Sequence, residues 1–107
     1  MHIAEVIVRC RVERPLLERW IALSWVRPLR AETGWQFSET DIARIELICD
    51  LNRDLGIDDE AIEVILPLLD QIYALRHRVR ALSDAIAALP EELRSDVLDR
   101  LDRAQRR

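Results

Sequence analysis

Residues 65–89 read ILPLLDQIYALRHRVRALSDAIAAL. Apolar side chains recur in this stretch at alternating intervals of three and four residues, at positions 65, 68, 72, 75, 79, 82, 86 and 89. Such a spacing, kept for more than three heptads, is typical of a helix that pairs with another helix in a coiled coil. Because Pro67 lacks an amide donor and clashes with the preceding turn, we expect it to kink or restart the helix. The stretch predicts a long helix with an apolar seam.

The seam also predicts how the chain associates. An apolar stripe of this length on a small chain is buried against a second chain or against a neighbouring helix of the same chain. We expect a homodimer, and the residues predicted at its interface are Ile72, Leu75, Val79 and Leu82. The alternative for these side chains is an intrachain core. Arg76, Arg78 and Arg80 flank the seam, and we expect them to contact water or to pair with acids across the dimer.

The remaining composition agrees with a mainly helical protein. Of the 107 residues, 50% are apolar, 34% are charged and only 5% are aromatic, and the chain contains two glycines. We divide it into a domain of residues 1–64 and a coiled-coil helix with a C-terminal extension, residues 65–107, in which Pro90 starts a final short helix. The sequence has no run of eighteen apolar residues and no signal peptide, so we expect a cytoplasmic protein without a membrane segment.

Two short helices joined by a turn are predicted near the N-terminus. Pro15 suits the first position of the second helix. Residues 3–10 fit either a helical stripe or a strand, because residues 6–8 are a β-branched run. With both segments helical, the turn at 11–13 completes a helix-turn-helix. Residues 25–37 are predicted to form a small hairpin, or wing.

The following helix begins with a clear capping signal. The Ser38 side chain can accept hydrogen bonds from the first amides, and Asp41 lies near the positive end of the helix. Apolar residues recur at helical spacing from there up to Leu55. Gly56 is predicted to end the helix in the left-handed conformation, and Asp58 to cap the next one.

Charge is distributed unevenly along the chain. Residues 36–75 contain two arginines and ten acids, whereas the segments before and after them each carry a net charge of +2. An acidic segment repels phosphate backbones and attracts basic partners. We predict that partner binding is carried by its central acids, which are Asp50, Asp54, Asp58, Asp59, Glu60 and Glu63. The alternatives are a solvated helix face and, for Asp58 and Asp59, helix capping alone.

The sequence offers no arrangement typical of an enzyme or a metal site. Cys10 and Cys49 do not belong to a closely spaced metal-binding motif, and we expect both to be reduced core residues. The two glycines cannot form a phosphate-binding loop, and no serine lies in the strained glycine turn of a nucleophile. We therefore expect no catalytic activity, no metal and no cofactor.

Taken in order, these elements resemble the MerR-type winged helix, through WVRP at 25–28 and GWQFSETDIARI at 34–45 among other stretches. The chain resembles one branch more closely, the chaperone modulator CbpM family. That likeness runs in order along about residues 3–85, and the stretches that carry it are Trp35-x-Phe37 with the following SETD, LNRDLGID at 51–58, AIEVI at 61–65 and LLDQIYAL at 68–75. The resemblance implies that residues 3–10 are helical. The predicted fold is therefore all-α, a MerR-like winged helix-turn-helix with a two-stranded wing, then a long coiled-coil helix and a short terminal helix.

The CbpM resemblance implies a function that composition alone does not. Members of that family bind the J-domain of a DnaJ-like co-chaperone, CbpA, and inhibit its stimulation of the DnaK chaperone. A J-domain carries a basic helix before its His-Pro-Asp loop, so a protein that covers this helix should be acidic. Residues 41–70 hold nine acids against two arginines, as this expectation requires.

A MerR-like DNA-binding transcriptional regulator is the alternative function. The second helix of such a protein presents arginines to phosphates. Here it offers only Arg14 and Arg19, and Pro15 removes an amide that could bind phosphate. The wing carries Arg30 but also Glu32. Because so few cations neutralise few phosphates, we expect weak DNA binding at physiological salt, and we consider nucleic acid an unlikely partner.

Overall fold

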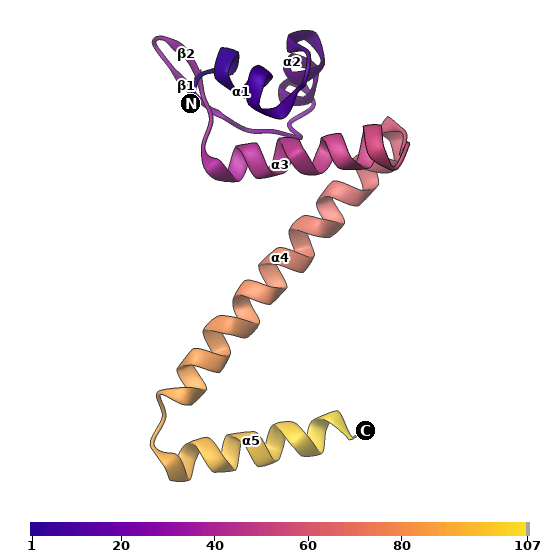
Figure 1. Ribbon diagram of the computed structural model, residues 1–107. Coiled ribbons are helices and arrows are strands. Elements are labelled where there is room, and N and C mark those ends of the chain that lie inside the picture. The colour runs from indigo at the N-terminus through magenta and orange to yellow at the C-terminus, as the bar shows by residue number, and fades with distance from the viewer. Residues whose placement is uncertain (107) are drawn as a thin grey trace. The chain divides into compact units, whose positions relative to one another are not determined.

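The computed structural model describes residues 1–106, which form two compact units, Met1–Pro67 and the part from Leu68 onward. The elements, in order, are α1 (Ile3–Cys10), α2 (Arg14–Ala22), β1 (Leu29–Ala31), β2 (Gly34–Gln36), α3 (Glu39–Cys49), the π-helical turn η1 (Asp50–Asp54), α4 (Asp59–Ala87) and α5 (Glu91–Gln105) (Figure 1). This order confirms the predicted fold class, a winged helix-turn-helix followed by a long helix and a terminal helix.

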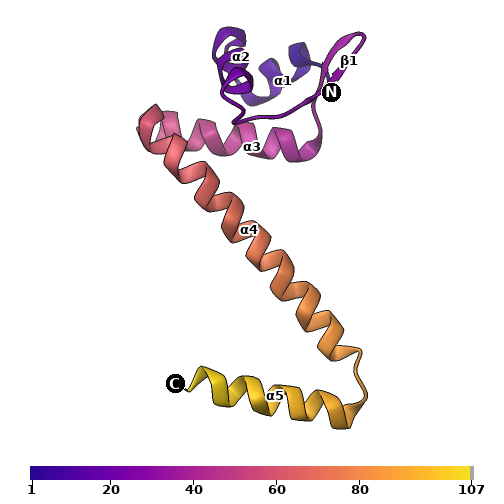
Figure 2. The same cartoon turned by 180° about the vertical axis from the view of Figure 1, so that it is seen from behind.

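Helices α1 and α2 form the helix-turn-helix. The chain leaves α1 through Arg11, which adopts a left-handed conformation with φ 53°, and Pro15 lies in the first turn of α2. The helical alternative for residues 3–10 is confirmed. The helix is favoured over a strand because it places Val6 and Cys10 one turn apart on the same face, where both are buried. Both helices lie on the same side of α3 (Figures 1 and 2).

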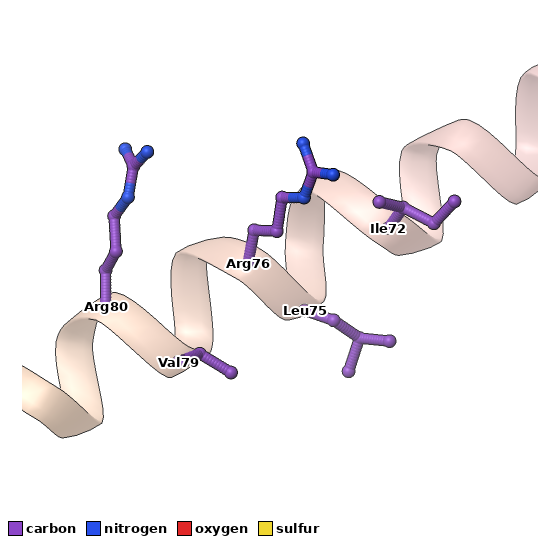
Figure 3. Close-up of a pocket in the computed structure, with 5 residues that line it drawn as sticks. All are labelled: Ile72, Leu75, Arg76, Val79 and Arg80. Atoms are coloured by element: carbon purple, nitrogen blue, oxygen red, sulfur yellow. The ribbon is translucent and has the colours of Figure 1, made fainter.

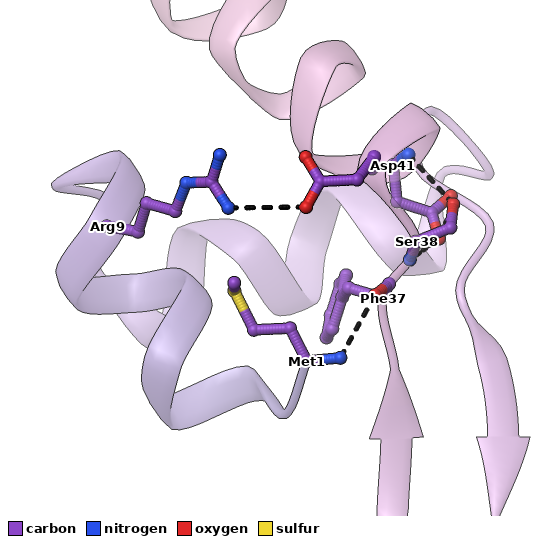
Figure 4. Close-up of polar contacts among 6 residues, drawn as sticks. Met1, Arg9, Phe37, Ser38 and Asp41 are labelled. Carbon is purple, nitrogen blue, oxygen red and sulfur yellow. Dashed lines mark hydrogen bonds and ion pairs between the residues drawn. The ribbon is translucent and has the colours of Figure 1, made fainter.

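The wing is an antiparallel hairpin in which Leu29 pairs with Gln36, Arg30 with Trp35 and Ala31 with Gly34. The first strand begins at Leu29 and the second ends at Gln36, so the hairpin is shorter than its predicted span, residues 25–37. The Met1 amino group donates a hydrogen bond of 3.2 Å to the Phe37 carbonyl (Figure 4). The start of the chain is therefore fastened to the exit of the wing.

Helix α3 begins as its capping signal predicted. The Ser38 hydroxyl accepts a hydrogen bond from the Asp41 amide at 3.2 Å, and the Asp41 carboxylate accepts one from the Ser38 amide at 2.8 Å (Figure 4). This reciprocal pair is a capping box, which satisfies two amides that the helix itself cannot. A 3.4 Å ion pair between Arg9 and Glu39 also joins α1 to the start of α3.

The end of this helical segment differs from the prediction. The regular spacing placed Leu55 on the apolar face, but the chain widens into η1, where the Leu55 amide bonds to the Asp50 carbonyl five residues back. The wider turn keeps Leu51 buried and leaves Leu55 69% exposed. Gly56 ends the segment with φ 66°, as predicted, because this conformation is open to a residue without a Cβ.

Helix α4 begins at its predicted cap, where the Asp58 carboxylate accepts the Ala61 amide at 2.9 Å. It passes Pro67 as one helix, so the expected restart is absent. Pro67 and Glu63 are both exposed, and water can bond the Glu63 carbonyl that loses its amide partner. Because α4 ends at Ala87, the last position of the predicted seam, Leu89, lies beyond it.

The hydrophobic core belongs to the first unit. It is built around side chains from four helices, all less than 2% exposed, which are Val6, Leu17, Ile45, Ile48, Ile62 and Leu66. The first turns of α4 are thus packed into the winged-helix core through Ile62 and Leu66. Beyond Leu66, the large apolar side chains of α4 and α5 are half-buried or exposed.

Candidate protein-binding site

The six acids predicted to bind a partner lie on one continuous part of the first unit. Asp50 and Asp54 belong to η1, Asp58 precedes α4, and the remaining three occupy its first turns. Figure 1 shows this part of the chain where α3 passes into α4. We call the six residues the acidic surface; they are Asp50, Asp54, Asp58, Asp59, Glu60 and Glu63.

Two members of the acidic surface have contacts inside the fold. Asp58 caps α4 through the Ala61 amide. Asp59 forms a 2.8 Å ion pair with Arg19, which ties the start of α4 to α2. Both acids therefore help to position α4 against the helix-turn-helix, and one negative charge is already matched by a cation of the same chain.

The other four acids are available to a partner. Their side chains are exposed, and within residues 1–106 they form no hydrogen bond and no ion pair; they are Asp50, Asp54, Glu60 and Glu63. Unpaired exposed carboxylates remain hydrated and keep their field in solution, where it can act on an approaching cation. The sequence predicted six partner-binding acids, and four of them are unpaired in the chain. Only the fold reveals that Asp58 and Asp59 already have partners.

The two arginines of the acidic segment donate hydrogen bonds to backbone carbonyls. Arg53 donates to the carbonyls of Arg11 at 2.7 Å and Cys10 at 3.1 Å, at the end of α1. Arg44 donates to the Trp25 carbonyl at 2.9 Å. A guanidinium at the carbonyl end of a helix is favourably placed against the helix dipole. Arg53 is thus a clamp between α1 and η1, a role that its sequence position did not reveal.

The acidic surface is accompanied by apolar side chains that sequence reasoning did not select. Leu55 is 69% exposed beside Asp54, and Val64 is 62% exposed beside Glu63. The helical spacing predicted Leu55 on the apolar face, and nothing in the pattern distinguishes Val64 from the core residues around it. Apolar anchors among charged groups are typical of protein-binding surfaces.

The cations of the helix-turn-helix are largely occupied within the chain. Arg14 lies 4.0 Å from Glu18 on α2, and Arg19 is paired with Asp59. On the wing, the Arg30 guanidinium lies 4.9 Å from the centre of the Trp35 ring, a cation–π contact. A helix-turn-helix whose arginines already contact acids presents a weak field to a phosphate backbone.

The predicted dimer face of α4 is accessible in the single chain. Ile72 is 43% exposed, Leu75 58%, Val79 60% and Leu82 64%. Figure 3 shows a shallow hollow on this helix, in which Ile72, Leu75 and Val79 lie beside Arg76 and Arg80. None of the four predicted interface residues is used as intrachain core.

The two cysteines are buried free thiols, as the sequence predicted. Burial is the main cause that raises the pKa of both thiols from the ordinary value of 9.0. Glu46 and Cys49 raise the pKa of Cys10 further, whereas Arg53 opposes the shift at Cys49. Both side chains are therefore protonated at neutral pH and lack the thiolate that reactive cysteines need.

The geometry described above, a helix-turn-helix with a wing followed by a long helix, has a counterpart among known families. The model of the MerR HTH family regulatory proteins matches residues 1–84. The chain belongs to this family. The MerR match extends from α1 through most of α4, so it includes the acidic surface and the apolar face, while α5 lies outside it.

The MerR match is to a family of regulatory proteins rather than to a family of enzymes. No curated protein and no solved structure was found to match the chain. Across residues 1–106, no helix is long and apolar enough to cross a membrane. The same residues contain no group of three or more metal-ligating side chains that could hold an ion.

Proposed function

We propose that this MerR-family protein is a chaperone modulator of the CbpM type, which binds the J-domain of a DnaJ-like co-chaperone and inhibits its stimulation of DnaK. The observation that carries the proposal is the set of four exposed, unpaired carboxylates at Asp50, Asp54, Glu60 and Glu63. The collinear CbpM resemblance supplies the identity of the partner. The cytoplasm, where DnaK works, is the compartment that this function requires.

Electrostatics support a basic helix as the element that is bound. Four carboxylates on one part of the surface attract a helix rich in lysine or arginine and raise its rate of encounter. The exposed Leu55 and Val64 would contact the apolar parts of such a helix and give the complex a longer lifetime. A J-domain whose basic helix is covered in this way can no longer dock on DnaK, so inhibition follows from occupancy alone.

The pairing of the helix-turn-helix cations argues against the DNA-binding alternative. Arg19 would have to leave Asp59, 2.8 Å away, before it could bind a phosphate, whereas the exposed 4.0 Å pair of Arg14 with Glu18 is weak and exchanges readily. An arginine that stays paired with an acid neutralises no phosphate, so the affinity for DNA falls with every such pair. A sequence-specific, salt-sensitive gel shift would favour the regulator over the chaperone modulator.

The proposed modulator is a homodimer that pairs through α4. Its support is the row of exposed apolar side chains at Ile72, Leu75, Val79 and Leu82, which the single chain leaves in water. Large apolar rows on a small protein are typical of protein interfaces. In the dimer, each copy would present its own acidic surface, so one dimer could bind two J-domains.

Charge reversal tests the proposed surface. We expect Asp50→Arg with Asp54→Arg to abolish binding to the J-domain of a CbpA-like protein from the same organism, without a loss of helical signal. The matched control is Glu5→Arg with Glu32→Arg, which makes the same change in net charge at exposed acids of α1 and the wing. The proposal predicts that the control still binds. An affinity that is unchanged in the first variant, or lost equally in both, would overturn the assignment of the surface.

A further inference from the structure

Helix α5 and the second half of α4 carry complementary charges. Between Asp70 and Asp84, α4 contains three arginines and no acid, whereas α5 contains five acids and three arginines. Helix α5 also lies outside residues 1–84, which the MerR family model matches. The family match therefore gives no information on the role of α5, which has to be sought in its own residues.

The arginines of α4 have no partner in the single chain. Arg76, Arg78 and Arg80 form no hydrogen bond and no ion pair with any residue in 1–106. Arg76 and Arg80 lie one turn apart on the same edge of the apolar row, where they flank the hollow beside Ile72 and Val79 (Figure 3). This edge combines an apolar floor with two unpaired cations.

Helix α5 carries acidic and apolar side chains along one side, so its charge is opposite to that of the Arg76–Arg80 edge of α4. Leu98 and Leu101, which are neighbours on the helix surface, are 50% and 45% exposed. Spacings of seven and four residues place Glu91, Leu98 and Asp102 on the same face of the helix. Glu91 has no partner among the described residues, and Asp102 is held only by an exposed i,i+4 pair with Arg106. Such a pair is weak enough to exchange for a better partner.

The two faces also agree in length. Helix α5 has 15 residues and is about 22 Å long at 1.5 Å per residue. The apolar row from Leu68 to Leu82 extends over fourteen residue steps, or about 21 Å. Both faces are exposed within one chain, so neither covers the other there.

We propose that α5 of one copy of this protein packs along the Arg76–Arg80 edge of α4 in a second copy, with Glu91 and Asp102 against the two arginines. In a two-fold symmetric dimer this contact is made twice, because each copy both donates α5 and receives one. In this dimer all four predicted interface residues are buried between the two copies: Ile72 and Val79 contact α5 of the second copy, and Leu75 and Leu82 remain for the pairing of the two α4 helices. It does not depend on the identity of the chaperone partner.

A charge swap between two chains tests this proposal. One variant carries Arg76→Glu and Arg80→Glu, and the other carries Glu91→Arg and Asp102→Arg. Alone, each variant brings like charges together at both contacts, and we expect its dimer dissociation constant to rise at least roughly tenfold. In an equimolar mixture, the mixed dimer has opposite charges at both contacts, because one contact keeps the unmodified pairing and the other carries the same pairing with its charges swapped. Mixed dimers should therefore form in preference to either variant's own dimer. Sedimentation equilibrium measures each case, and circular dichroism checks that the variants keep their helices.

Three results would overturn the proposal. Separate variants that dimerise as well as the unmodified protein would show that α5 takes no part in the interface. Variants that dimerise weakly both alone and mixed would show that the two edges do not meet across the dimer. An unmodified protein that stays monomeric at about 100 µM, a concentration at which even a weak specific complex forms, would exclude the second copy as the occupant.

Discussion

Replacement of Arg53 by methionine should lower stability while sparing partner binding. The Arg53 guanidinium donates to the Arg11 carbonyl at 2.7 Å and to the Cys10 carbonyl at 3.1 Å. Hydrogen bonds from a charged donor contribute about 1.5–3 kcal/mol each in a protected site, but Arg53 is exposed and solvent screens it. We therefore expect the two bonds together to contribute about 1–2 kcal/mol to the free energy of unfolding, which urea titration measures.

The same substitution removes a positive charge from the segment that carries the acidic surface. J-domain association should therefore be as fast as in the unmodified protein, or faster at low salt. Arg53→Lys is the matched control, because it keeps the charge but lacks the planar fork that reaches two carbonyls. We expect it to recover part of the stability. A loss below about 0.5 kcal/mol for Arg53→Met, the range of ordinary surface substitutions, would refute the role of Arg53 as a clamp.

Three further predictions concern the buried thiols, the α3 cap and the dimer. Because burial raises the pKa of Cys10 and Cys49 above 9.0, the unfolded chain loses these protons first, and the free energy of unfolding should fall as pH rises through 9.0 toward the folded values. In urea titrations between about pH 8 and pH 10, the free energy of unfolding should decline less steeply with pH in Cys10→Ala with Cys49→Ala than in the unmodified protein. An equally steep decline in both proteins would contradict the thiols as the cause. Ser38→Ala removes the capping box and should cost about 1 kcal/mol in the same assay, whereas no loss would mean that water replaces the cap. Leu75→Asp with Leu82→Asp should give the mass of a single chain in sedimentation equilibrium, and a persistent dimer would place the interface elsewhere.

The parts of the fold that could be predicted from the sequence have local causes. Ser38 with Asp41 marks the start of α3, Gly56 marks the end of η1, and Asp58 marks the start of α4. Each signal acts within four residues, so it can be recognised without knowledge of the fold. Residues 3–10 could not be decided locally, since a β-branched run fits both states and only the burial of one helical face favours the helix.

The π-helical turn shows why regular spacing was a poor guide at Leu55. Extending the helical pattern assumes that every turn has the same width, which places Leu55 on the core side. One wider turn at η1 is enough to place it in water, while Leu51 stays buried. The Ile57 amide bonds to the Leu51 carbonyl at 2.9 Å, and the Asn52 side chain bonds to the Ile57 carbonyl at 3.2 Å. These contacts hold the wider turn, and the hydrophobic pattern does not encode them.

The negative charge of the acidic surface could be predicted from the sequence. Which of its carboxylates are left without a partner in the chain could not. Counting acids selects the segment, because net charge is a property of composition. The pairing of Asp59 with Arg19 joins residues forty positions apart, and only the packing of α4 against α2 brings them together. The same is true of Arg53, whose partners lie at the end of α1. The sequence therefore overestimated the number of free acids and missed the clamp.

The central claim is that the unpaired carboxylates bind a basic J-domain. The most direct measurement is a calorimetric titration of the purified protein with the J-domain of a CbpA-like co-chaperone from the same organism, at two salt concentrations. The proposed function predicts a dissociation constant of about 1 µM or tighter at low salt, and weaker binding at high salt as the charges are screened. An absence of binding at both salt concentrations would contradict it, as would binding that does not respond to salt.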